Sequence, residues 1–207
     1  PKSMKNHGAL LPERVPEFFE NLLSEKKTVG LALAFAILTA SRAYPVRAAK
    51  WEDIDLQKKE WLVPEDDMKV KGRGRFKVYL SDQAVSLLES LPDRTGIVFK
   101  GKNGMIGYSS MVARIKHMNS RRVANKLPQW LDEKQSEKLG KDVVVTPHGV
   151  ARASFKTWTR TKENLKKFHQ DAVELCLAHD IDDKYDGAYD RADLEEERRR
   201  VMAAWGE

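Results

Sequence analysis

Residues 28–42 read TVGLALAFAILTASR, and this segment determines the architecture that we expect for the whole chain. Apart from one glycine and one threonine, positions 29–40 are all apolar. A helix that is apolar on every side packs against neighbours on several sides. The run is about a dozen residues long, shorter than the roughly 20 that a membrane-spanning helix needs. We therefore predict a buried central helix over Thr28–Ser41, with Arg42 at its end.

The composition is that of a basic, globular chain. It has 207 residues, of which 41% are hydrophobic and 33% are charged, which suffices for a sizeable core. The net charge of +6 makes a polyanionic partner plausible. Cys176 is the only cysteine, so no intramolecular disulfide can form, which fits a reducing cytoplasm. No signal peptide and no zinc-ligand spacing are visible.

Around the central helix, the sequence predicts an α+β fold, mainly α-helical with a small antiparallel β-sheet. A hairpin with a basic, glycine-containing tip at residues 69–74 is expected between two strands. Ser81 and Thr146 are expected to cap helices, and residues 127–141 read as a polar insertion. Helices are predicted over residues 12–23, 45–49, 81–91, 108–125, 146–158, 162–179 and 194–205, and strands over residues 51–56, 60–63, 75–80 and 96–99.

Several segments carry side chains suited to chemistry on a phosphodiester. Such a transfer needs a nucleophile, cations that neutralise the charge growing on the phosphate oxygens, and an acid for the leaving hydroxyl. Arginine suits the cationic role because its planar fork donates two hydrogen bonds to phosphate and stays protonated. The chain holds candidates for each role.

Four short segments carry these side chains: Leu38-Thr39-Ala40-Ser41-Arg42, Met68-Lys69, Thr146-Pro147-His148-Gly149 with Arg152, and Leu177-Ala178-His179 with Ala188-Tyr189. Their order and spacing resemble the signature boxes of the tyrosine recombinases, the phage integrase family. The closing stretch 177–205 is similar to P4-like integrases, which serve prophages and genomic islands. The resemblance covers nearly the whole chain and implies the tyrosine recombinase catalytic-domain fold.

The resemblance implies a role for each matching residue. Arg42 and Arg152 would clamp the scissile phosphate, and His179 would donate a hydrogen bond to one of its oxygens. Lys69 would protonate the leaving 5′-oxygen. Tyr189 would attack phosphorus and form a 3′-phosphotyrosyl link, which another strand's 5′-hydroxyl can reverse. No metal or other cofactor is implied.

Two positions depart from the family pattern. Three residues separate His148 from Arg152, whereas the family usually has two there. Both spacings keep the pair on one helix face, so His148 is still expected to assist proton transfer. Pro45 stands where most members carry an acidic residue, so another group must orient the neighbouring basic side chains.

Neighbouring residues compete for two of these roles. Lys71 is a rival for the general acid, and Tyr185 is a rival nucleophile, although the context Ala188-Tyr189-Asp190-Arg191 favours Tyr189. His7, His117 and His169 are expected to be ordinary surface or partly buried residues. Contacts with the DNA backbone, which supply affinity but little sequence information, are predicted for Lys71, Arg73, Arg75, Lys116, Arg121 and Arg122, with solvated surface charge as the alternative.

The function that the resemblance implies is site-specific DNA recombination, the integration or excision of a prophage or genomic island. The partners would be double-stranded DNA attachment sites, further copies of the chain in a homo-tetramer, and an excision accessory factor. No membrane partner is expected, and the location would be the bacterial cytoplasm, in association with the nucleoid. Two alternatives stay open: DNA relaxation like that of a type IB topoisomerase, and a noncatalytic DNA-binding protein.

The resemblance also predicts how the chain is organised. Residues 1–207 are expected to form one catalytic domain, in which residues 1–10 are the linker from a missing N-terminal DNA-binding domain. The charged helix at 194–205 is expected either to contact a neighbouring protomer or to lie solvated on the surface.

Overall fold

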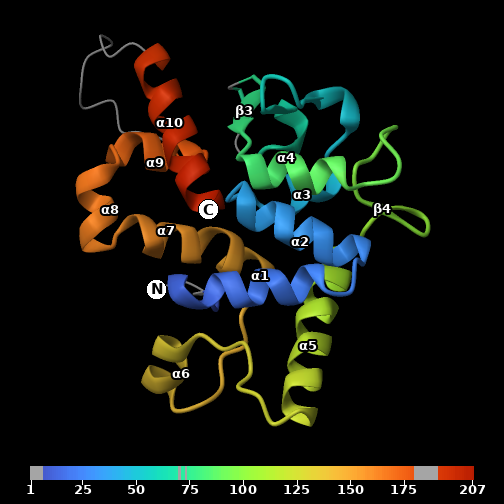
Figure 1. Ribbon diagram of the computed structural model, residues 1–207, viewed down its shortest axis with the longest axis vertical. Coiled ribbons are helices and arrows are strands. Elements are labelled where there is room, and N and C mark those ends of the chain that lie inside the picture. The colour runs from blue at the N-terminus through green and yellow to red at the C-terminus, as the bar shows by residue number, and fades with distance from the viewer. Residues whose placement is uncertain (1–6, 70, 73, 180–190) are drawn as a thin grey trace.

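The computed structural model of the protein describes residues 7–69, 71, 72, 74–179 and 191–207 (Figure 1). For residues 191–193 it describes the backbone only. Arg73, Tyr185 and Tyr189 lie outside the described residues, as do residues 1–6 of the expected linker.

The predicted fold class is confirmed: the chain is mainly helical and has a small antiparallel sheet. The elements η1 to η3 are 3₁₀ turns, and η4 is a π-helix. The helical elements are η1 (Pro12–Arg14), α1 (Val15–Leu23), α2 (Thr28–Leu38), α3 (Ala43–Ala48), η2 (Trp51–Asp53), η3 (Glu65–Asp67), α4 (Asp82–Glu89), α5 (Tyr108–Ala124), α6 (Glu133–Leu139), η4 (Gly149–Ala153), α7 (Ser154–Thr159), α8 (Lys162–Lys167), α9 (Gln170–Cys176) and α10 (Arg191–Gly206). The strands are β1 (Ile54–Asp55), β2 (Glu60–Val63), β3 (Phe76–Tyr79), β4 (Lys100–Gly101) and β5 (Gly104–Met105).

Helix α2 is the buried centre that its sequence predicts. It contacts α1, α4, α5 and η4, and all of its residues from Ala32 to Leu38 are buried (Figure 1). The Phe35 ring lies 5.4 Å from the Trp61 ring of β2 and 5.5 Å from the Phe99 ring. The helix ends three residues before the predicted Ser41, and the turn that follows directs Arg42 out of the core.

The sheet has the order β1-β2-β3, with both pairs antiparallel. Trp61 pairs with Val78, and both side chains face the core. The β2–β3 connection contains Lys69, as the hairpin prediction required. The sheet therefore positions a basic loop at its edge.

Helix α10 packs back onto the same chain. Val201 and Met202 are buried, and the helix contacts α9, α4, β3 and α2. Trp205 Nε1 donates a hydrogen bond to the Ile37 carbonyl of α2 at 2.7 Å. The solvated alternative for this helix is therefore wrong, whereas a contact with a neighbouring protomer stays a prediction.

The single helix predicted over residues 162–179 is wrong. The chain breaks between α8 and α9 at Phe168, whose backbone is extended with φ −120° and ψ 138°. The Phe168 ring is buried 5.4 Å from the Trp158 ring, and this packing turns the chain. Leu165 of α8 is 48% exposed.

Three smaller predictions also need correction. Residues 51–53 form a 3₁₀ turn instead of a strand, and only Ile97 of the predicted strand 96–99 makes a bridge, with Lys50. The polar segment 127–141 contains α6, capped by the Asp132 side chain, and a fully buried Trp130. This segment is therefore anchored to the core.

Candidate active site

The turn after α2 and the π-helix η4 bring the two predicted arginines to one small recess. Arg42 and Arg152 both line this cavity of about 20 Å³, together with Ser41, Met68 and Ala178. The Arg42 side chain is half-buried and has no hydrogen-bond or ion-pair partner among the described residues. Burial lowers its pKa, because the charged form loses hydration. A half-buried cation without a carboxylate is suited to bind an anion.

Arg152 connects two segments of the site through hydrogen bonds to their carbonyls. Its side chain donates from Nη1 to the Ala40 carbonyl at 2.9 Å and from Nη2 to the Leu177 carbonyl at 2.7 Å. It thereby joins the end of α2 to the end of α9, and it is only 5% exposed. Burial and the nearby charge of Arg42 lower the pKa of Arg152 to about 9, so the guanidinium stays charged at neutral pH.

The two carbonyls that Arg152 binds lie beside strained backbone. Ala40 has φ 47°, and Ala178, which follows Leu177, has φ 49°. The left-handed region costs an L-residue about 1–2 kcal/mol. Strain of this kind concentrates at functional sites, where surrounding contacts maintain it. Here both alanines lie just past a helix end that is closed by backbone hydrogen bonds, from the Ser41 N–H to the Ala36 carbonyl and from the His179 N–H to the Glu174 carbonyl. The Arg152 guanidinium adds its own bonds to these contacts.

His179 belongs to a chain of polar contacts that includes an acid missed by the sequence analysis. Its Nδ1 lies 2.8 Å from Glu174 Oε2, and its Nε2 lies 3.0 Å from Arg152 Nη2. A carboxylate only accepts, so His179 must donate from Nδ1. Lys156 Nζ donates to the other Glu174 oxygen. Burial raises the Glu174 pKa, but the hydrogen bonds from Lys156 and His179 outweigh burial and lower it.

The extra residue between His148 and Arg152 is accommodated in a π-helix. Residues 149–153 form this π turn, which holds one more residue than an α turn and occurs frequently at functional sites. Thr146 caps the helix as predicted, its Oγ1 accepting from the Gly149 N–H at 3.0 Å. Burial is the largest cause that lowers the pKa of His148 to about 4, with smaller contributions from His7, Arg152, Arg42 and His179. The His148 ring is therefore neutral at neutral pH and close to the arginines.

The segment before η1 is part of this site. His7 is exposed, as expected, and its ring lies 4.3 Å from the ring of His148. Leu10 is buried, and the Gly8 carbonyl accepts from the Thr146 N–H at 2.9 Å. Residues 8–10 of the expected linker are therefore packed against the domain, and the linker itself stays a prediction. Motifs within one segment do not reveal these contacts, because the partners are more than 130 residues apart in the sequence.

The β2–β3 connection places Lys69 near the recess through its neighbour Met68, which lines it. Lys69 is exposed and has no partner among the described residues. Lys71 Nζ instead donates to the carbonyls of Glu65 and Asp66, at 3.0 and 2.6 Å. This difference favours Lys69 over Lys71 as the acid.

Comparisons with known proteins agree with this geometry. The model of the Phage integrase family matches residues 9–180. The chain belongs to the phage integrase family. It is 26% identical over 205 residues to the prophage integrase IntA of Escherichia coli, covering 98% of this chain and 44% of IntA. It is 26% identical to the integrase of Enterobacteria phage P4, over 97% of this chain and 45% of that integrase. The chain thus spans less than half of these curated relatives.

Two solved structures show that this member of the phage integrase family shares the recombinase fold. The crystal structure of XerA recombinase matches with a TM-score of 0.53 and 16% identity, covering 98% of this chain and 60% of the other. A lambda integrase dimer bound to a COC′ core site matches with a TM-score of 0.55 and 15% identity, covering 91% and 63%.

The predicted DNA contacts of this integrase-family chain fall into two groups. Lys116 is exposed on α5, and Arg75, whose side chain is 62% exposed, lies 3.7 Å from Asp53. Arg121 is also exposed, although it pairs with Glu25 at 2.5 Å. These side chains can reach a polyanion.

Arg122 needs a correction. Its guanidinium lies 4.0 Å from the centre of the Trp130 ring, and Nη1 donates to Glu17 at 2.7 Å. Its Nε donates to the Pro128 carbonyl. Because the side chain is buried and its Nε and Nη1 donate within the domain, Arg122 anchors the segment after α5 and is not placed to contact DNA.

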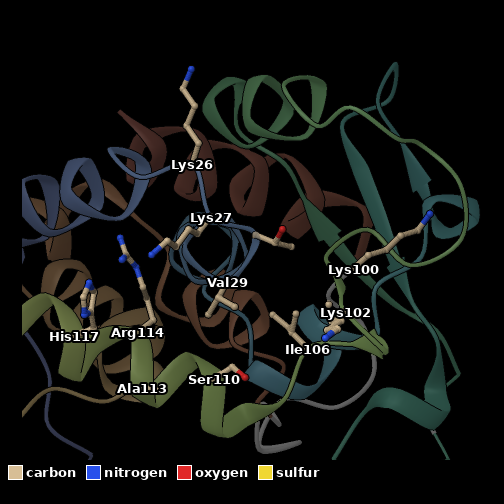
Figure 2. Close-up of a pocket in the computed structure, with 12 residues that line it drawn as sticks. Lys26, Lys27, Val29, Lys100, Lys102, Ile106, Ser110, Ala113, Arg114 and His117 are labelled. Carbon is tan, nitrogen blue, oxygen red and sulfur yellow. The ribbon is translucent and has the colours of Figure 1, made fainter.

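A second, larger basic hollow lies between the α1–α2 turn, the β4–β5 hairpin and α5 (Figure 2). Its volume is about 570 Å³. Lys26 and Lys27 line one side and Lys100 and Lys102 the other, while Val29 and Ile106 lie between them. The side chains of Lys26 and Lys102 have no hydrogen-bond or ion-pair partner among the described residues. The sequence analysis missed these lysines because they come from separate segments.

The described residues form neither a candidate metal site nor a candidate membrane span. No group of three or more histidine, cysteine or acidic side chains is placed to hold a metal ion. No described helix is long and apolar enough to cross a membrane.

Proposed function

We propose that this chain is the catalytic domain of a site-specific recombinase, which cleaves and rejoins DNA through a tyrosine nucleophile. The observation that carries the proposal is the convergence of Arg42 and Arg152 on one recess, with His148 and His179 beside them. Two guanidinium groups that share a recess suit a phosphate carrying two charged oxygens in the transition state.

The proposed reaction assigns each proton and bond. The scissile phosphate binds between Arg42 and Arg152, and Tyr189 Oη attacks phosphorus as neutral His148 takes the tyrosine proton. The P–O5′ bond breaks, and Lys69 gives its proton to the leaving 5′-oxygen. A 5′-hydroxyl of another strand reverses the step, so the phosphotyrosyl link conserves the energy of the bond.

Arg152 Nη2 donates to His179 Nε2, because a guanidinium has no acceptor. To donate from Nε2 to a phosphate oxygen instead, His179 must release this contact and carry a proton on each ring nitrogen, because Nδ1 already donates to Glu174. The Glu174 carboxylate stabilises that charged ring. We infer that Glu174, held by Lys156, takes the orienting role for which Pro45 leaves no acid.

The partners remain part of the proposal. Solved recombinases of this fold include complexes with DNA, among them XerH bound to palindromic difH substrate. By analogy, double-stranded attachment sites are the substrate, a homo-tetramer holds two of them, and an accessory factor assists excision. The proposed location is the bacterial cytoplasm, in association with the nucleoid.

The proposal is tested with nicked suicide DNA substrates drawn from sequences flanking candidate attachment sites. The parent chain is expected to form a protein–DNA adduct that survives denaturing electrophoresis. Tyr189→Phe should abolish this adduct, because phenylalanine has no hydroxyl, while the matched variant Tyr185→Phe should retain it. Binding without an adduct would support the noncatalytic alternative. Relaxation of supercoiled DNA without exchange between two duplexes would support the topoisomerase alternative.

The basic hollow is proposed to contact the DNA backbone outside the cleavage site. Lys26→Gln combined with Lys102→Gln should make log K for a DNA duplex less steep in log salt by up to about 1.8, about 0.9 per lost phosphate contact. The matched control is Lys162→Gln with Lys166→Gln on α8, which lies away from the β4 hairpin (Figure 1). Fluorescence anisotropy at several salt concentrations measures the slopes, and equal slopes for both double variants would remove the hollow from the DNA interface.

A further inference from the structure

We propose that His7 is a positioning residue for His148, and that the docked segment His7–Leu10 completes the active site. The inference rests on the proposed function, because it assigns a purpose to the neutral His148 ring. Its basis is the contact between this segment and the π turn of η4.

The segment is fixed at three successive residues, at Gly8 and Leu10 to the two sides of η4 and at Ala9 to the N-cap of α6. The Gly8 carbonyl accepts from the Thr146 N–H, and the Ala9 N–H donates to Asp132 Oδ2 at 2.9 Å. Leu10 and Ser154 exchange two hydrogen bonds, of 3.0 and 2.8 Å. These bonds run to both ends of the π turn, so the position of the segment and the shape of the turn are coupled.

The Gly8 carbonyl lies so close to the π turn that residue 149 must be glycine. A Cβ on Gly149 would lie 1.8 Å from the Gly8 oxygen. Gly149 lies in the same π turn that accommodates the extra residue before Arg152. The departure in spacing and the docking of the segment are therefore parts of one local arrangement.

His7 is placed to keep water and protons from His148. The two rings are tilted by 44° with centroids 4.3 Å apart, and His7 is the exposed member. The other charged or titratable groups that face His148 are Arg42 after α2, Arg152 of η4 and His179 after α9. All of them disfavour a proton on His148. With the His7 ring as a cover, His148 stays ready to accept the tyrosine proton.

The first test is titration of His148 by NMR on the whole chain with labelled histidine, with the signal assigned from a His148→Gln variant. The parent pKa should be near the lowered value of about 4, and His7→Ala should raise it toward 6.5. His7→Phe preserves the ring and should keep the pKa low. His169→Ala, at an exposed histidine, should leave it unchanged. An unchanged His148 titration in His7→Ala, or an equal rise in His7→Phe, would overturn the proposal.

Cleavage of a suicide substrate provides the second readout. At pH 5.5, His7→Ala should cleave up to about tenfold more slowly than the parent, because a ring of pKa 6.5 is mostly protonated there. At pH 8 the two rates should converge, and His7→Phe should follow the parent. A slow rate that is independent of pH would show a structural defect instead and would contradict the positioning role. Absence of cleavage by the parent would refute the proposed function, whereas the NMR result for His7 would stand.

Discussion

Replacing Arg152 by lysine is expected to slow DNA cleavage by at least about 100-fold, the effect of removing one preorganised donor to a developing oxyanion. Lysine keeps the charge but loses the planar fork, so one ammonium cannot bind the Ala40 and Leu177 carbonyls and a phosphate together. Because the buried carbonyls then lose partners, the free energy of unfolding should fall by about 1–3 kcal/mol.

The matched control is Arg160→Lys, the same exchange at an exposed arginine that follows α7. Single-turnover cleavage and urea denaturation of both variants separate the catalytic effect from the structural one. Cleavage by Arg152→Lys within threefold of the parent rate would contradict the phosphate clamp.

Gly149→Ala is expected to lower the free energy of unfolding by about 2–4 kcal/mol. The new Cβ would meet Gly8 backbone atoms at 1.8 and 2.5 Å, and backbone cannot yield as a flexible side chain can. The segment at residues 7–10 would have to leave, exposing Leu10, whose burial alone contributes about 1.5–3 kcal/mol. Urea denaturation measures the loss, and hydrogen exchange at the Thr146 amide should show that its bond to Gly8 is gone.

Gly107→Ala is the control for this change, because the nearest atom to its new Cβ is the Ser109 hydroxyl at 3.3 Å, which can rotate. Its effect should stay below about 1 kcal/mol, the scale of a helix N-cap change. A Gly149→Ala variant as stable as the parent, with Thr146 still protected, would show that the segment does not dock as described.

Short-range sequence patterns, such as apolar runs and capping residues, predicted the elements that depend on contacts between near neighbours in the chain. Helix α2 is apolar on all faces and is buried, and Ser81 and Thr146 cap the helices that follow them. The break at Phe168 could not be predicted in this way. It arises because the ring packs on Trp158, ten residues earlier in the chain, and periodicity within the segment does not report that contact.

The residues of the candidate site also divide into those that a short motif predicts and those that only the fold brings together. Arg42 and Arg152 were predicted from short motifs and meet in the recess. Glu174 has no motif of its own, and the one available signal is its position five residues before His179. His7 reaches His148 only through the fold, because the two residues lie far apart in the sequence, so sequence proximity gives no indication of the contact.

The proposed mechanism depends most on Tyr189, the residue that would become covalently linked to DNA. The adduct from a suicide substrate, digested with nuclease and trypsin, should give one modified peptide, residues 185–191, which contains both Tyr185 and Tyr189. Fragment-ion mass spectrometry of that peptide then locates the phosphorylated residue. The account predicts that the 3′-phosphonucleotide is on Tyr189, and finding it on Tyr185, or on any other residue, would contradict it.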